Sequence, residues 1–597
     1  MAEALISPGV FLSENDQSQI TAGPITVGAA LIGPTVLGRV NIPTLITTYS
    51  EYSAKFGTTF VSGGVSYDYL TSQAAYNYFQ QGGTSLLVTR VASGSYSSAT
   101  ASVATVASTS SFAFELETLS VGTIMNNNVS ASAAFVTGGL LPSGSANNIR
   151  WQVSQVDSGS GLFTIIVRQG NDTTSNQSVV ETWSNLSLDP NQNNYIAYVI
   201  GDQTQNVKYD DAGVAYLQIT GSYPNASNYI RVSEVYTPTP NYLNPQGQAY
   251  SYYTSSLPAA GSGSLNGAFG GATGPLYGCL NATTYATTAP LNMYTSIPVI
   301  ASVGSSPTTN TQGVFADSYN TAISLLANTD AYAYNAVYAP GITSQNASSQ
   351  VSTILAMVQN RGTSIAVVDM VGYAQSISAV STLAQSYDNS YGATYWPWLQ
   401  VRSIETGKLN FVPASTIIPA VYEYNDKVSA EWFAPAGLNR GGLPTVIQPE
   451  IRLTVAQRNT LYSAKVNPIA VFPGQGTVVY GQKTLQARAS ALDRVNVRRL
   501  LIALKSYIGQ IAETLVFEQN TAVTRNKFLS QVNPYLDYVQ QRQGLYAFRV
   551  VMDDTNNTPD VIDRNLLVGA IYLQPTRTAE FIQLTFNVLP TGVTFGA

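Results

Sequence analysis

Histidine is absent from the 597-residue sequence, and both charged residues and cysteine are scarce. Without histidine, neither a Ser-His-Asp nor a Cys-His catalytic arrangement can form, and the usual Cys/His zinc site is excluded. The single cysteine, Cys279, has no second cysteine in this chain with which to form a disulfide. Charged residues make up 10% of the chain, against about 25% in an ordinary soluble protein. The composition therefore favours a subunit covered by other copies, or a β-rich structural protein.

Long apolar runs are also missing, because Gly, Pro or polar residues interrupt each one before it could span a bilayer. The opening MAEALISPGVFLSE lacks the cationic start and apolar core of a secretion signal. We therefore expect no membrane insertion and assembly in the cytoplasm. No cofactor or metal site is expected either.

The net charge of −6 is unevenly distributed along the chain. From Arg440 onward there are 16 Lys and Arg against 10 Asp and Glu, whereas the preceding 439 residues carry 11 against 23. The C-terminal third is thus the basic part. Proteins that bind nucleic acid usually have a larger excess of basic residues, with aromatic residues among them. We therefore expect this basic part to bind a protein surface of complementary charge instead.

The clearest positive feature is an amphipathic helix predicted over residues 496–517, NVRRLLIALKSYIGQIAETLVF, with Asn496 as its cap. Apolar residues from Val497 to Leu515 recur at steps of three and four and so share one face. Two arginines stand near the helix start, where the dipole disfavours cations, so we expect them to meet a partner elsewhere. A solvated helix face or ion pairs between subunits would give the same pattern. The predicted basic set is Arg494, Arg498, Arg499 and Lys505.

The chain after this helix is expected to form a second helix and three strands. The helix is predicted over residues 524–543, with a kink or break near Asn533 because Pro534 follows. LYAFRVVMDD and LLVGAIYLQP read as strands separated by a turn. EFIQLTFNVLP is the last strand, and its apolar residues alternate with polar ones as in a strand with one buried face. Those apolar residues are Ile582, Leu584, Phe586 and Val588.

The opposite end of the chain has a similar extended character. LISPGVFLSENDQS combines a Pro-Gly turn with a short β-leaning run and no helical period. Neither end has a visible local partner, so we expect both to add strands to a neighbour's sheet; a frayed N-terminus and packing within the chain's own domain are the alternatives. The N-terminal arm residues are Ser7, Pro8, Gly9, Val10 and Phe11.

Taken in order, NVRRL, VFEQN, NTPDVID and TRTAEFIQL resemble the C-terminal domain of tail sheath proteins from contractile phage tails and related injection systems. The SPGV opening, the block GAALIGPTVLGRV, and the stretch FVPASTIIPAVYEYNDKVSAEWFAPAGLNRGGL are similar to other parts of the same family. The family often has Gly-Gly-Asp-Gly in an earlier loop, where this chain has Gly270 and Gly271 followed by Ala-Thr-Gly. The role of that loop is therefore open.

The resemblance implies an α/β multidomain fold with five parts. These are an extended N-terminal arm (1–22), the first part of a central α/β domain (23–92), a β-rich inserted outer domain (93–240), a non-catalytic subtilisin-like central α/β domain (241–477), and an α+β C-terminal sheath domain ending in a strand-exchange arm (478–597). About three to five domains also suit the length of the chain.

The resemblance also implies the function. The chain is expected to be a structural, non-enzymatic subunit of a contractile sheath, stacked as hexameric rings in a helical tube around an inner tail tube. Contraction then drives that tube through the envelope of a target cell. Baseplate and tail terminator proteins are the further partners, and the location is the virion tail or an injection particle. The basic helix is expected to face an acidic band on the tube.

Three weaker patterns point to enzymatic chemistry. GTVVYGQKT nearly matches a phosphate-binding loop, but Gln482 occupies the lysine position and Lys483 is displaced by one, so a strand and turn are expected. The acidic pairs Asp210–Asp211 and Asp553–Asp554 are adjacent residues that fit turns better than a glycosidase site. A tailspike-type glycosidase, or another β-rich surface protein, remains the alternative function.

The absence of histidine also bears on how contraction is triggered. No side chain in this sequence has an unperturbed pKa between about 5 and 8. Mild acidification is therefore not expected to trigger contraction unless burial strongly shifts the pKa of a carboxylate. A mechanical trigger is favoured.

Overall fold

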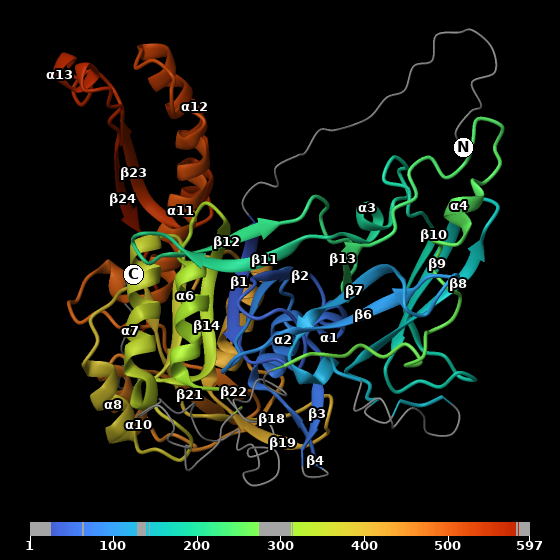
Figure 1. Ribbon diagram of the computed structural model, residues 1–597. Helices are drawn as coiled ribbons and strands as arrows, with labels where there is room; N and C mark the ends of the chain where they lie inside the picture. Colours follow the sequence, from blue (N-terminus) through green and yellow to red (C-terminus); the bar gives the residue numbers. More distant parts are fainter. Residues whose placement is uncertain are drawn as a thin grey trace, which may run out of the picture.

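The computed structural model describes residues 25–62, 65–127, 139–141, 144–273, 312, 314–580 and 583. At its centre is a six-stranded sheet in the order β16-β15-β14-β1-β5-β2, parallel except for β2 at one edge (Figure 1). The strands are β1 (Ile25–Gly33), β2 (Thr44–Ile46), β5 (Leu86–Arg90), β14 (Tyr332–Thr343), β15 (Ile365–Asp369) and β16 (Gly392–Ala393).

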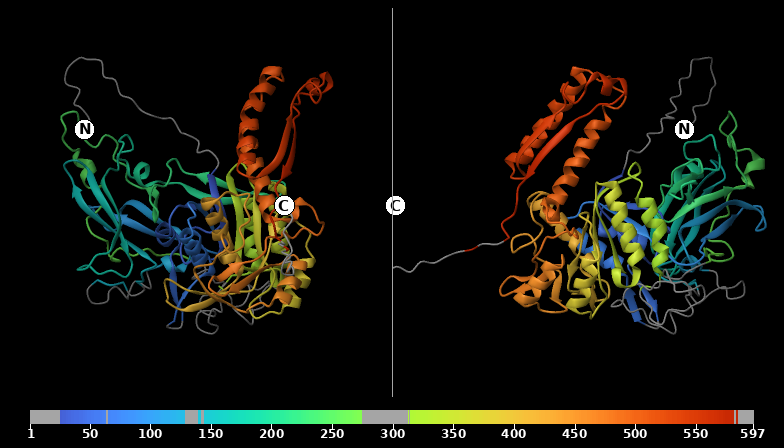
Figure 2. Two further views of the ribbon diagram at one scale, coloured as in Figure 1. Left: turned by 180° about the vertical axis from the view of Figure 1, so that it is seen from behind. Right: turned by 90° about the vertical axis from the view of Figure 1, so that its left-hand side faces the viewer.

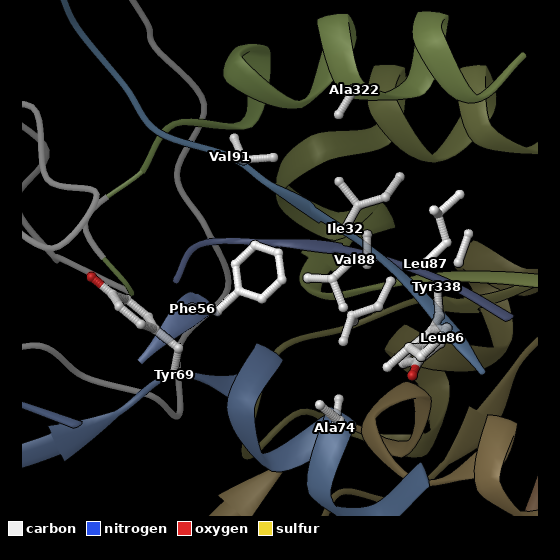
Figure 3. Close-up of a cluster of buried hydrophobic side chains, with 14 of the residues drawn as sticks. Ile32, Phe56, Tyr69, Ala74, Leu86, Leu87, Val88, Val91, Ala322 and Tyr338 are labelled. Carbon is white, nitrogen blue, oxygen red and sulfur yellow. The ribbon is translucent and has the colours of Figure 1, made fainter. Parts of the chain in front are cut away.

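Helices cover both faces of this sheet, so its inner strands are buried on both sides. Figure 3 shows Ala74 of α2 and Ala322 of α6 on opposite sides of the side chains of β1 and β5. All five residues of β5, LLVTR, and of β15, IAVVD, are buried, which is why each strand begins with consecutive apolar residues rather than alternating ones. The helices around the sheet are α1 (Tyr49–Phe56), α2 (Leu70–Gln80), α6 (Asn320–Leu326), α7 (Ser344–Arg361), α8 (Ile377–Gln385) and α9 (Ile418–Val428).

Between β5 and β14 the chain leaves the central sheet and forms a β-rich region. It contains two three-stranded antiparallel sheets, β10-β9-β8 and β13-β7-β6, and the hairpin β11-β12. The rings of Phe114 and Phe163 stack between the two sheets at 5.7 Å. Bridges join residues 258–270 to β6 and β8, so the chain still packs with these strands after residue 240.

The elements of the β-rich region are as follows. Its strands are β6 (Ser98–Ala104), β7 (Phe112–Val121), β8 (Ile149–Asp157), β9 (Leu162–Gln169), β10 (Val179–Leu186), β11 (Thr204–Tyr209), β12 (Ala215–Thr220) and β13 (Ile230–Val235). Its short helices are η1 (Thr123–Met125), α3 (Ile196–Ile200) and α4 (Ser251–Thr254).

Small sheets extend the central body below the main sheet. They are β17-β21-β22, β19-β18-β20 and the hairpin β3-β4. Their strands are β3 (Thr59–Ser62), β4 (Val65–Asp68), β17 (Tyr395–Trp396), β18 (Leu399–Arg402), β19 (Leu409–Val412), β20 (Val446–Pro449), β21 (Asn467–Phe472) and β22 (Gly476–Val479). The other helices of the body are η2 (Ala316–Tyr319), η3 (Ala414–Thr416), α10 (Val455–Ser463) and η4 (Ala491–Asp493).

A C-terminal unit projects from this body in Figures 1 and 2. It consists of α11 (Val495–Glu513), α12 (Ala522–Gln541), β23 (Leu545–Val551), α13 (Pro559–Asp563) and β24 (Ala570–Pro575). It has its own apolar core, in which Leu500, Val532 and Leu536 pack with Trp432 of the body. None of the helices in the described ranges is long and apolar enough to cross a membrane.

Two local predictions for this unit are wrong, the break near Asn533 and the cap at Asn496; the alternative to the break, a kink near Asn533, stays a prediction. The helix α12 continues through Pro534 without a break, because Val532 and Leu536 on either side of the proline are both fully buried in the same core. That packing outweighs the roughly 3 kcal/mol that an internal proline costs. Asn496 does not cap α11: the helix begins one residue earlier, and the Asn496 side chain is buried and donates to the Trp432 carbonyl at 3.3 Å.

Candidate functional site

The candidate site is the joint where α11 leaves the body and the residues around 580 return to it. The first half of α11 is buried and its second half is largely exposed. The predicted basic residues Arg494, Arg498 and Arg499 all lie at the buried end. The joint therefore gathers cations where a helix start repels them, and each needs an acceptor.

Arg499 provides the strongest contact of the joint. Its guanidinium donates to both carboxylate oxygens of Asp426 in α9, at 2.9 and 2.5 Å, and lies 4.6 Å from the ring centre of Tyr422. Burial lowers its pKa, but the charge of Asp426 outweighs burial and holds the pKa above its usual value. Because the side chain of Arg499 is only 5% exposed, this two-point ion pair ties α11 firmly to α9.

Arg498 and Lys505 converge on the segment before β16. Arg498 donates to the carbonyl and the hydroxyl of Ser390, at 3.2 and 2.5 Å, and stacks 3.9 Å from the ring centre of Tyr391. Lys505 lies about two turns further along the same face of α11; it donates to the Tyr391 hydroxyl at 3.0 Å and is otherwise exposed. Burial lowers the pKa of Arg498.

Arg494 holds the returning segment. It donates to both oxygens of Glu580, at 2.7 and 3.0 Å, and also pairs with Asp493 at 2.9 Å. Glu580 accepts further hydrogen bonds from the Tyr462 hydroxyl at 2.8 Å and from Gln482 at 3.1 Å. The segment that leads to the final predicted strand is thus anchored at the base of α11.

The segment GTVVYGQKT, which nearly matches a phosphate-binding loop, has a structural role at the joint. GTVV forms β22, as expected for a strand and turn, and Gln482 is used to hold Thr578 and Glu580. Lys483 donates to the Tyr462 carbonyl at 2.8 Å and lies over the ring of that tyrosine. Both side chains therefore serve the joint.

The four basic residues are brought together by the structure, but their partners lie within the chain. The sequence pattern indicates the cations but not their acceptors, Asp426 and Glu580. Asp426 lies 73 residues before Arg499. Nothing in the local pattern of either acid marks it as a partner. That α11 faces a tube stays a prediction. While these contacts hold, the charges of the three arginines are used within the chain and are not available to an acidic band on the tube.

Two carboxylates have strongly raised pKa values: Glu423, partly buried near the joint, and Asp369, buried in the body. Burial raises the pKa of Glu423 to about 7, the nearby Asp426 adds to this, and Arg499 opposes it. Burial likewise raises the pKa of Asp369 to about 7, against hydrogen bonds from the Ser415 hydroxyl at 2.5 Å and its backbone N–H at 3.2 Å. Mild acidification is not expected to trigger contraction unless burial strongly shifts the pKa of a carboxylate. Glu423 and Asp369 are carboxylates with such a shift.

The hairpin β23-β24 is the second part of the site. The two strands pair only with each other among the described residues, so each has an outer edge with unpaired backbone groups. Tyr546 and Tyr572, 64% and 62% exposed, lie on these strands. The predicted arm residues Ser7 to Phe11, Ile582, Leu584, Phe586 and Val588 lie outside the described residues.

The acidic pairs lie in turns, as expected. Asp210 accepts from the backbone N–H groups of Ala212 and Val214 between β11 and β12. Asp553 caps a turn through Thr555, and Asp554 pairs with Arg525. In the part of the chain that the structure describes, no group of three or more Cys, Asp or Glu is placed to hold a metal ion.

Comparison with known proteins finds matches to the C-terminal half of the chain. Residues 311–485 match the sequence model of the phage tail sheath protein central domain, and residues 488–589 match that of the phage tail sheath C-terminal domain. The tail sheath proteins of Vibrio phage KVP40 and Enterobacteria phage T4 are 43% and 42% identical to this chain over 185 residues. Those residues are 31% of this chain and 28% of each relative, so the match spans less than a third of the relatives' length.

One solved structure is similar over more of the chain. A sheath tail protein from Listeria innocua aligns with 89% of this chain and 89% of its own length, at 10% identity and a TM-score of 0.48.

Proposed function

This chain carries the central and C-terminal domains of the phage tail sheath family, and from that premise we propose that it is a structural subunit of a contractile sheath. Copies of it stack as hexameric rings in a helical tube around an inner tail tube, and contraction drives the tube through the envelope of a target cell. The observation that carries the proposal is the match of both domains in consecutive segments of one chain. Baseplate and terminator proteins close the two ends of the tube, and assembly takes place in the host cytoplasm.

We propose that the body adopts the subtilisin-like fold of the family but has no protease activity. The parallel sheet covered by helices on both faces supports this, and the sequence has no histidine for a catalytic triad. The β-rich region between β5 and β14 is then an insertion that faces outward. It is the part of the subunit free to vary without disturbing the lattice.

The link between subunits is strand addition to the hairpin β23-β24. Its two open edges can each accept an extended arm, one from a neighbour's N-terminus and one from another neighbour's C-terminus. Arg494 anchors Glu580, the residue at which the predicted last strand begins. If Ile582, Leu584, Phe586 and Val588 become fully buried, they contribute at most about 6 to 12 kcal/mol per copy.

The contacts of Arg494, Arg498 and Arg499 suggest how movement passes through the subunit. They fix the C-terminal unit to the body at the base of α11, so a rotation of the body is transmitted to the hairpin and to its neighbours. We propose that α11 still faces the inner tube, with Lys505 as its exposed cation. The three arginines act as internal fasteners.

Negative-stain microscopy of the purified protein tests the proposal. We expect hollow tubes of uniform width that form without any other protein, or on addition of the tube protein. A chain that stays monomeric with and without tube protein would overturn it. The alternative function is tested in the same preparation by incubation with host polysaccharide and a reducing-sugar assay, where a sheath subunit releases no sugar.

A further inference from the structure

A cleft of about 310 Å³ lies between the body and the β-rich region. One wall is formed by the segment around β2 and by α1, and includes Arg39, Ile42 and Lys55; the other includes Ser120, Gln205 and Asn225. Two cations line the cleft and no Asp or Glu does. This is unexpected in the first 439 residues of the chain, where acidic residues outnumber basic ones by 23 to 11.

Arg39 is the cation of this cleft whose charge is not balanced. Its guanidinium donates to the side-chain oxygen of the neutral Gln205, at 3.2 Å, and no carboxylate of the described residues lies within 4.0 Å of it. Lys55 pairs with Glu51 at 2.7 Å, and the neighbouring Arg231 pairs with Glu117. Burial lowers the pKa of Arg39, and the like charge of Arg231 acts in the same direction. Partly buried cations are normally paired, so this guanidinium is suited to a carboxylate from outside.

Asn225 also lines the cleft, but its side chain is engaged elsewhere. Its side-chain N–H donates to the Gln203 carbonyl at 2.6 Å, and its Oδ1 lies against Gly201. Arg39 is therefore the group of the cleft that favours a carboxylate.

We propose that this cleft binds an acidic side chain of a second copy of the chain, with the carboxylate on Arg39. The acidic surplus of residues 1–439 makes a second copy a partner of complementary charge. The choice of a second copy rests on the proposed sheath function. The binding of a carboxylate by the cleft does not.

The test compares self-assembly of the wild type with Arg39→Gln and Arg39→Lys at low salt, measured by sedimentation as the critical concentration. We expect Arg39→Gln to raise it by about tenfold or more, and Arg39→Lys to raise it less because the charge is kept. Arg402→Gln is the control, since Arg402 is exposed and donates to the Gly407 carbonyl of its own turn. A critical concentration of Arg39→Gln within twofold of the wild type overturns the proposal. So does a large fall in the melting temperature of the monomer, because Arg39 would then serve the fold itself.

A second measurement separates this inference from the proposed function. Citrate, which carries free carboxylates, should raise the melting temperature of the wild-type monomer relative to sodium chloride of equal ionic strength, and should not do so for Arg39→Gln. If the wild type never assembles but the citrate effect is present, the sheath function fails and the carboxylate site stands. No citrate effect in the wild type overturns the site. A citrate effect together with normal assembly of Arg39→Gln overturns the second copy as its occupant.

Discussion

Replacing Arg499 by Met should loosen the C-terminal unit from the body. The substitution keeps the bulk of the side chain but removes the cation that neutralises Asp426, and it leaves Glu423 beside an unbalanced charge. Arg499 is 5% exposed and the Asp426 side chain 18%, so this pair is far more buried than a surface ion pair. Removing one partner of a buried pair costs about 3 to 5 kcal/mol, whereas an exposed pair contributes about 0 to 1 kcal/mol.

The assay is limited proteolysis of the monomer in increasing urea, with cleavage followed in α11 and α12. Arg499→Met should shift the onset of cleavage to lower urea by an amount equivalent to about 3 kcal/mol or more. Arg402→Met is the matched control, because it removes an exposed arginine from the body. Adding Asp426→Leu should recover part of the loss, since no buried charge is then left unpaired. A loss below about 1 kcal/mol for Arg499→Met would refute the idea that this pair fastens the unit.

Three other outcomes are expected. The folded-state pKa of Glu423 is raised from 4.5 to about 7, so its contribution to stability is fully present below about pH 4.5 and is lost as pH rises through 7. The loss should reach about 3 kcal/mol at pH 8 and should be absent in Glu423→Gln, as measured by urea titrations of the monomer at several pH values. Removing residues 1–12, or changing Leu584 and Phe586 to Asp, should leave a folded monomer that forms no tubes by microscopy, and normal tubes from either variant would mean that the arms are not the links. Glu580→Ala should weaken assembly more than it lowers the melting temperature, because it frees the start of the arm; equal loss of both would point to a purely structural role.

The elements that the sequence predicts well are those whose signal is local. The apolar stripe of α11, the helix α12, and the strands β23 and β24 all follow from periodicity and turn residues within one segment. Short-range patterns of this kind do not depend on the rest of the fold.

The joint could not be predicted, because its contacts join residues far apart in the chain. The helix dipole argument correctly indicated that Arg498 and Arg499 need acceptors. It could not choose between an acid on another protein and Asp426 in the same chain. The unbroken helix through Pro534 was missed for the same reason, since only the shared core of the C-terminal unit outweighs the local cost of proline.

The most direct test of the account is a helical reconstruction by electron cryo-microscopy of tubes assembled from this protein. The account predicts a four-stranded sheet at each C-terminal unit, with β23 and β24 in the middle and one strand from a different neighbouring subunit along each outer edge. It also predicts that Arg499 stays paired with Asp426 of its own chain. Tubes in which the edges of β23 and β24 remain open, or in which both added strands come from the same subunit, would contradict it.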